Sequence, residues 1–262
     1  MIFRNRRLRS FFTVLTSVAA VSAMGLGLAQ AARSPLFTLR SLAIELPAPG
    51  APLDRAEIQA LAGVPLDQIN LFDLSLAPIE SRLLAHPWVR SVSLSKRFPQ
   101  TLGVSIVFRE PRALLQTSEG GVRYIDQDGT VFGSVSLDRA ANLPILSGFA
   151  SQERARILEC LGFLTAWDRA GLTHLTDLSS LSYDPERGYR AWVMYSLSAA
   201  SLSPRGRSRA QVTLGHTLEA EPGPQLDRLS RVMASLTARG IAARQIWADT
   251  GKKVVVKIGK GS

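Results

Sequence analysis

Residue types that commonly catalyse reactions or bind metals are scarce among the 262 residues of this sequence. It contains three histidines, His86, His174 and His216, and a single cysteine, Cys160. His86 precedes a proline at a predicted helix end, and the other two histidines lack a ligand-spaced partner, so we expect solvated or capping roles. One cysteine excludes an intramolecular disulfide and any multi-cysteine metal site. The sequence therefore predicts no metal and no cofactor.

The remaining nucleophiles and carboxylates are better explained by structure than by catalysis. Cys160 falls on the apolar side of a predicted helix, where a buried thiol is expected. No serine lies in a Gly-x-Ser-x-Gly turn or a Ser-x-x-Lys pattern. Asp126 and Asp128 could form a carboxylate pair, but their place in a predicted hairpin is typical of turn chemistry. We expect a protein that is not an enzyme, with a periplasmic hydrolase as a weaker alternative.

The N-terminal segment predicts where the chain is located. Arginines at positions 4, 6, 7 and 9 precede an uncharged run from Phe11 to Ala32. Such a run can cross a hydrocarbon core of ~30 Å, and the positive flank keeps residues 1–10 in the cytoplasm. We expect a single transmembrane helix over 11–32 in the cell inner membrane, with the bulk of the chain in the periplasm. The alternative is a cleaved signal peptide, because residues 29–31 fit a cleavage site and Arg6-Arg7 hints at a twin-arginine signal.

The basic character of the chain has two interpretations. The net charge is +10, partly from the N-terminal arginines, and one short cluster lies at Arg205, Arg207 and Arg209. Spread basicity suits a domain beside an anionic membrane surface. Nucleic-acid binding is the other interpretation, but neither a DNA-binding motif nor an aromatic-rich basic stripe supports it.

The first part of the exported chain predicts a β-α-α-β-β unit. Period-two alternation indicates strands over 42–46, 91–95 and 101–108. Asp54 and Glu57 form a capping pattern for a helix that stops at Gly63, and a second helix runs from about Ser75 to before Pro87. The last two strands are close in sequence, so they should pair antiparallel. The unit is expected to be a three-stranded sheet covered by two helices.

The second part, from about Pro111 to Lys257, predicts a β-rich unit with two helices. Strands over 122–125 and 130–132 flank an Asp-Gly hairpin turn. Helical spacing of apolar residues indicates helices over about 152–170 and from Pro224 to Gly240. Further strands are expected over 178–183, 191–197, 210–214, 244–248 and 253–258. The fold class is α+β.

Several short motifs occur in a fixed order behind the basic anchor. The stretch from His86 to Val92 resembles the Pro-Trp-Val signature of the FtsQ/DivIB family of bacterial cell-division proteins, and the likeness continues at 96–102, 109–113, 124–132 and 143–148. The motif residues are Pro87, Trp88, Val89, Pro99, Glu110, Pro111, Asp126, Gly129, Pro144 and Gly148. Trp88 is expected in the core of the first unit, with a recruitment surface as the alternative.

This resemblance implies a domain organisation and a function. It implies a cytoplasmic tail (1–10), a transmembrane helix (11–32), a POTRA domain (35–108), an FtsQ-type β-domain (109–258) and a short tail (259–262). It implies a non-enzymatic divisome scaffold at the septum that links early and late division proteins. The expected partners are an FtsB–FtsL-type complex at the end of the β-domain, and FtsK-, FtsW- and FtsI-type proteins at the POTRA domain and membrane helix. The alternative is a POTRA-bearing component of protein secretion or outer-membrane assembly.

The end of the β-domain is therefore the expected partner-binding site. Here the stretch from Ile246 to Gly251 departs from the Val/Ile-Asp-Leu-Arg pattern of many family members, so backbone pairing to an open strand edge is the expected mode. The alternative is an edge guarded by lysines without a partner. The candidate partner-binding residues are Ile246, Trp247, Thr250, Gly251, Lys253, Val254, Val255, Val256 and Lys257.

Overall fold

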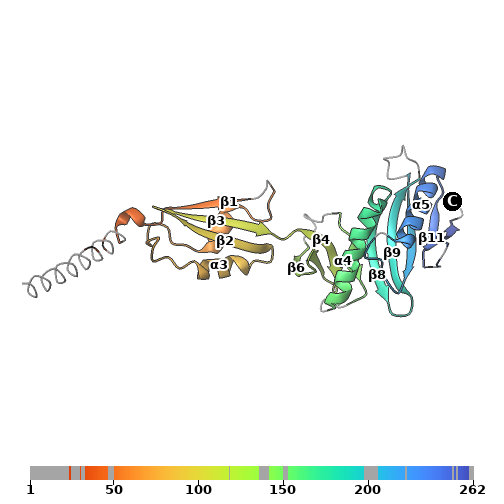
Figure 1. Cartoon of the computed structure of the whole chain (residues 1–262), viewed down its shortest axis with the longest axis horizontal. Helices are drawn as coiled ribbons and strands as arrows, with labels where there is room; N and C mark the ends of the chain where they lie inside the picture. The colour runs from red at the N-terminus through yellow and green to blue at the C-terminus, as the bar shows by residue number, and fades with distance from the viewer. Residues whose placement is uncertain are drawn as a thin grey trace, which may run out of the picture. The chain divides into compact units, whose positions relative to one another are not determined.

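The structure is a computed structural model that describes residues 24, 30, 33–46, 50–117, 119–135, 142–149, 153–197, 206–221, 223–249, 251 and 253–259. The chain divides into two compact units, Met1–Arg109 and Glu110–Ser262 (Figure 1), and each has its own hydrophobic core. The expected transmembrane helix over 11–32 lies outside the described residues, apart from Met24 and Gln30. Within the described ranges, the helices are too short or too polar to span a bilayer.

The first unit has the predicted β-α-α-β-β order. Its elements are η1 (Pro35–Phe37), β1 (Ser41–Glu45), α2 (Arg55–Ala62), α3 (Ala77–Leu84), β2 (Val89–Arg97) and β3 (Thr101–Phe108). The sheet order is β1-β3-β2, with β1 parallel and β2 antiparallel to the central β3. The predicted antiparallel pairing of β2 and β3 is confirmed.

Local sequence signals explain these elements. The Asp54 carboxylate accepts the Glu57 N–H at 2.7 Å, while the Glu57 carboxylate accepts the Asp54 N–H at 2.8 Å. This capping box starts α2, and Gly63 ends it in the left-handed conformation with φ +56°. Alternate residues of β3 are buried, as its period-two pattern predicts, and they pack beneath Ile58 of α2 and Ile79 of α3.

The second unit is built on a nine-stranded mixed sheet. Its strands are β4 (Pro111–Gln116), β5 (Val122–Asp126), β6 (Val131–Ser134), β7 (Ile145–Ser147), β8 (Thr176–Asp184), β9 (Gly188–Ser196), β10 (Arg207–Gly215), β11 (Ala243–Trp247) and β12 (Val255–Ile258). The order across the sheet is β12-β11-β10-β9-β8-β7-β4-β5-β6. Strands β4 and β7 were not predicted, because each follows or contains a proline and β7 has only three residues.

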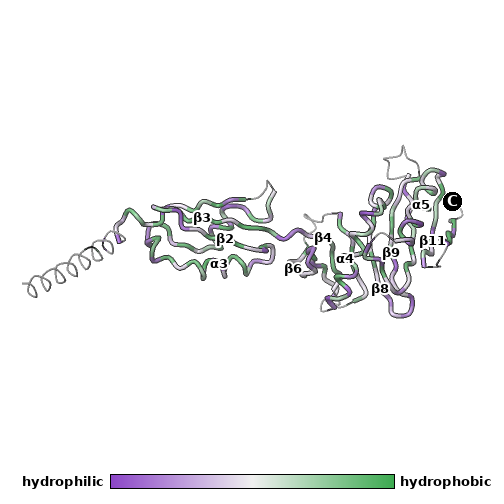
Figure 2. The backbone as a smooth tube through the Cα atoms, viewed as in Figure 1, coloured by the Kyte–Doolittle hydropathy of each residue, from purple (hydrophilic) through white to green (hydrophobic). Residues whose placement is uncertain are grey.

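Two helices and one sheet face form the core of this unit. The helices are α4 (Arg154–Arg169) and α5 (Pro224–Arg239), and a short η3 (Leu172–His174) follows α4. Along β9 the residues Tyr189, Ala191, Val193 and Tyr195 are buried while their neighbours are half-buried. Figure 2 shows hydrophobic and hydrophilic stretches along the backbone of both units. Both helices join this face in a single hydrophobic cluster.

Candidate functional site

Strand β12 forms one edge of the nine-stranded sheet. It pairs antiparallel with β11, with Val255 opposite Trp247 and Val256 opposite Ile246. Within the described ranges, no strand pairs with the outer side of β12. The edge therefore presents backbone donors and acceptors to an incoming chain.

The pairing register identifies which backbone groups face outward. The Ala248 N–H donates to the Thr213 carbonyl of β10 at 2.9 Å, so even-numbered residues of β11 face β10 and Trp247 faces β12. Val255 lies opposite Trp247, and its backbone groups therefore face β11. Because successive residues of a strand face opposite sides, the outward N–H and C=O groups of β12 belong to Val256, in the middle of the strand, and to Ile258, at its end.

The side chains of β12 divide between the core and the solvent. Val254 and Val256 are half-buried and pack against the core of the second unit. Val255 is 48% exposed and Ile258 is 60% exposed, which is unusual for branched apolar side chains on a strand. An apolar edge with open backbone groups favours either a partner strand or aggregation.

Basic residues surround this edge. Lys253 is exposed two residues before β12 and Lys257 is exposed within it, and the exposed Arg244 lies on β11 beside Gly259. Gly251 has φ +74° in the β11–β12 connection. Of the other predicted residues, Ile246 is fully buried and Trp247 is half-buried, whereas Thr250 lies outside the described residues. Among the predicted residues that the structure describes, Gly251, Lys253, Val255 and Lys257 are exposed, whereas Val254 and Val256 are half-buried.

The hairpin carboxylates have a structural role. Asp126 is buried, and its Oδ1 accepts the N–H groups of Asp128 at 3.0 Å and of Thr130 at 2.8 Å. Gly129 completes the turn with φ +76°. The predicted turn chemistry is confirmed, since the Asp126 carboxylate binds backbone donors.

The other motif residues fix strands and corners. The Pro144 carbonyl accepts the Leu114 N–H at 2.9 Å, and Gly148 has φ +88° where β7 meets β8. Pro99 follows Phe98 in the β2–β3 turn, and Glu110 and Pro111 lie at the boundary of the two units. Pro87, Trp88 and Val89 form the corner between α3 and β2. There Val89 is buried, whereas Trp88 is half-buried against the edge of the core rather than within it.

The reactive side chains of α4 are also structural. Burial raises the pKa of the Cys160 thiol to about 12. The Tyr189 hydroxyl donates to the Glu159 carboxylate at 2.6 Å, and burial followed by this bond raises the pKa of Tyr189 above its usual value. Glu159 also accepts the Leu218 N–H at 3.3 Å. These contacts attach α4 to β9 without leaving an available nucleophile.

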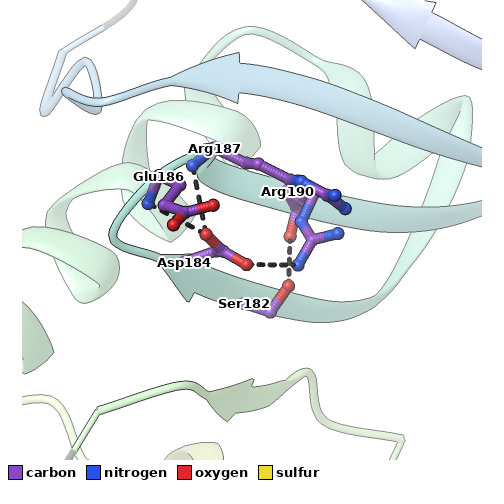
Figure 3. Close-up of polar contacts among 5 residues, drawn as sticks. All are labelled: Ser182, Asp184, Glu186, Arg187 and Arg190. Carbon is purple, nitrogen blue, oxygen red and sulfur yellow. Dashed lines mark hydrogen bonds and ion pairs between the residues drawn. The ribbon is translucent and has the colours of Figure 1, made fainter.

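A second carboxylate cluster closes the β8–β9 turn (Figure 3). Asp184 Oδ1 accepts the N–H groups of Glu186 at 2.9 Å and of Arg187 at 3.1 Å, and Oδ2 lies 3.5 Å from Arg190. The Glu186 N–H is the main reason that the pKa of Asp184 is lowered. In the part of the chain that the structure describes, no group of three or more His, Cys, Asp and Glu residues could hold a metal ion.

The structure also contains one cavity that the sequence did not predict. A cavity of about 210 Å³ lies between α4 and the start of β8, and it is lined by Arg112, Trp167 and Asp168 among others. Arg112 and Asp168 form an ion pair across its mouth. The buried Trp167 Nε1 has no hydrogen-bond partner among the described residues. No sequence motif signals this cavity, because its lining comes from distant segments.

Comparisons with known proteins agree with the two-unit architecture. Residues 51–107 match the family model of the FtsQ-type POTRA domain, and residues 113–254 match that of the C-terminal region of the cell division protein FtsQ/DivIB. Similar curated proteins include the cell division protein FtsQ of Anaeromyxobacter sp. strain K, 26% identical over 95% of this chain and 82% of the relative. The FtsQ protein of Geobacter sp. strain M21 is 27% identical over 84% of this chain and 76% of the relative.

These matches support the cell-division interpretation over the secretion alternative. The C-terminal family model alone covers more than half of the chain. The fold agrees, since each matched segment lies within one of the two units, although β1 and β12 fall just outside the matched residues. The chain belongs to the FtsQ/DivIB family of bacterial cell-division proteins.

Proposed function

We propose that this chain is a non-enzymatic divisome scaffold. In this proposal, residues 11–32 anchor it in the inner membrane, and the two described units lie on the periplasmic side at the septum. It links early and late division proteins by binding an FtsB–FtsL-type complex. The observation that carries the proposal is the open, apolar edge of β12, which ends a nine-stranded sheet.

The binding mode follows from the chemistry of that edge. An extended partner segment adds antiparallel or parallel to β12 and takes up the outward N–H and C=O of Val256. Val255, 48% exposed, gives the added strand an apolar side chain to cover. Lys253 and Lys257 favour a segment that carries carboxylates, chiefly by speeding its association. FtsK-, FtsW- and FtsI-type proteins are further partners in this proposal, at the POTRA domain and the membrane segment.

A proline at the outward-facing position tests this mode. Val256→Pro removes the N–H that faces the partner but leaves the Val255 groups that pair with β11. Val256→Thr is the matched control, because it keeps both the N–H and the β-branched shape. We expect the proline variant to lose at least tenfold in affinity for the purified partner complex, measured by interferometry, while the threonine variant stays within about threefold.

Two measurements keep this test decisive. Circular dichroism and urea unfolding establish that each variant is folded before binding is measured. If Val256→Pro does not fold, the double change Lys253→Glu and Lys257→Glu replaces it, with a slower association rate and reduced salt dependence expected. A folded proline variant that binds the partner with wild-type affinity excludes strand addition at β12.

A further inference from the structure

Three phenylalanines, two of them exposed and one half-buried, form a cluster at one end of the POTRA domain. Phe37, Phe72 and Phe98 come from η1, from the α2–α3 connection and from the β2–β3 turn. The ring centroids of Phe72 and Phe98 are 4.6 Å apart, and Phe37 lies 5.0 Å from Phe72 and 6.0 Å from Phe98. We call these three residues the aromatic tip.

The aromatic tip is distinct from the domain core. None of its three rings belongs to the buried cluster of the first unit or to the residues packed against it. Phe98 is 50% exposed and Phe72 is 47% exposed, and the neighbouring Leu36 is 66% exposed. Large apolar side chains that contact one another yet remain in water mark an interaction surface rather than a folding requirement.

Backbone contacts hold the aromatic tip in place. The Leu71 N–H donates to the Phe37 carbonyl at 2.8 Å, and the Phe72 N–H donates to the Asn70 side chain at 2.9 Å. The Arg40 N–H donates to the Gln100 carbonyl of the β2–β3 turn at 2.9 Å. Figure 1 shows this turn at the same end of the sheet as η1. The three rings are therefore presented by a rigid part of the domain.

Cations border the aromatic tip. Lys96 donates from Nζ to the Phe72 carbonyl at 3.1 Å, and the exposed Arg33 and Arg40 lie on either side of η1. Arg97 is paired with Glu45 at 2.5 Å. The carboxylates closest to Phe72 in the sequence are those of the exposed Asp67 and Asp73. Aromatic rings bordered by cations are typical of surfaces that lie at the headgroup level of an anionic bilayer.

The position of the aromatic tip in the chain favours an anionic membrane as its binding partner. Phe37 is five residues after Ala32, where the uncharged run ends. Five residues span at most about 17 Å, so an anchor over 11–32 holds Phe37 close to the bilayer surface. At that distance the tethered rings meet lipid at a far higher effective concentration than any soluble partner.

From these observations we infer that the aromatic tip inserts into the headgroup region of the anionic membrane that carries the anchor. This inference rests on the proposed membrane topology. Insertion of Phe72 and Phe98 orients the POTRA domain relative to the membrane plane, with its β2–β3 turn against the lipid. In this inference, residues 96–100 of the family motif contact lipid in addition to forming the β2–β3 turn.

Vesicle binding by residues 33–262, which contain both cores but no anchor, tests the lipid contact by itself. We expect these residues to sediment with vesicles of 30% phosphatidylglycerol in phosphatidylcholine, and less with phosphatidylcholine alone. The double change Phe72→Ser and Phe98→Ser should weaken binding at least tenfold. The matched control is Leu84→Ser with Val107→Ser, two similarly exposed apolar residues outside the aromatic tip, and it should bind like wild type.

A second measurement uses the full chain in nanodiscs of the same lipid. Hydrogen exchange should be slower at residues 70–73 and 96–101 in the nanodisc than in residues 33–262 free in solution, and the Phe72→Ser, Phe98→Ser variant should lose this protection. Protection in the nanodisc supports the inference even where the untethered fragment binds too weakly to sediment. If the fragment does not bind vesicles and the full chain shows no protection in the nanodisc, the inference is overturned. Self-association of the fragment through the same two residues would also overturn it, because the surface would then bind a second copy of the chain. If alkaline carbonate extracts the full chain, the anchor fails while vesicle binding still reports on the aromatic tip.

Discussion

Replacing Gly148 by alanine should destabilise the second unit strongly, because two separate costs arise at this position. Gly148 has φ +88°, a conformation that costs an alanine about 1–2 kcal/mol. A Cβ there would also lie 2.1 Å from the Tyr183 carbonyl oxygen of β8. Relieving this contact requires a backbone shift of about 1 Å where β7 pairs with β8, at about 1–3 kcal/mol. The free energy of unfolding should fall by about 3 kcal/mol.

Gly120 provides a control that separates the two costs. It has φ +81°, but a Cβ there would meet nothing within 4 Å. Gly120→Ala should therefore cost only about 1 kcal/mol. Urea unfolding of residues 33–262, followed by tryptophan fluorescence, reports on the second unit because three of the four tryptophans lie in it. Equal losses for Gly148→Ala and Gly120→Ala would refute the close approach of Gly148 to Tyr183.

Three further experiments, two with substitutions and one with thiol labelling, test the site description. Asp126→Ala leaves the N–H groups of Asp128 and Thr130 without their acceptor, and it should cost about 2–3 kcal/mol in urea unfolding. The folded-state pKa of Asp184 is lowered, so the stability its charge contributes is present above about pH 4 and lost as the pH falls through that lowered pKa. The urea midpoints of wild type and Asp184→Asn should therefore converge between about pH 5 and pH 2. Cys160, with its pKa raised to about 12, should react with a disulfide reagent at pH 8 only after unfolding; rapid labelling of the folded chain would contradict its burial.

The sequence predicts elements well where local signals are complete. The capping box at Asp54 and the stop at Gly63 define α2, and the alternating residues of β3 define the central strand of the first unit. The Asp-Gly turn after Asp126 correctly predicts the β5–β6 hairpin. In each case the structure depends on neighbours within a few residues, which is the information that a pattern contains.

Features that depend on distant segments were not predictable in this way. Strand β7 is defined by its pairing with β4 on one side and β8 on the other. Its three residues are too few to show the alternation of buried and exposed side chains that predicts a strand. The aromatic tip joins residues 37, 72 and 98, whose proximity follows only from the folded chain. Trp88 was expected in the core at the corner between helix and strand; it lies at that corner, but it is half-buried and packs against the core from outside. The outward direction of the Val256 N–H follows from the β10–β11 register rather than from the sequence of β12.

The short β7 also determines how the second unit transmits mechanical load. The first unit is joined covalently to β4, whereas the proposed partner site lies on β12. Within the sheet, tension between them crosses β7, which pairs with β4 through two residues and with β8 through three. Helix α4 bridges this narrow join, since Arg154 donates to the Asp128 carbonyl at 3.1 Å on one side and Glu159 binds Tyr189 on the other. Under force the sheet should therefore part first at β7, and α4 sets the load at which it does.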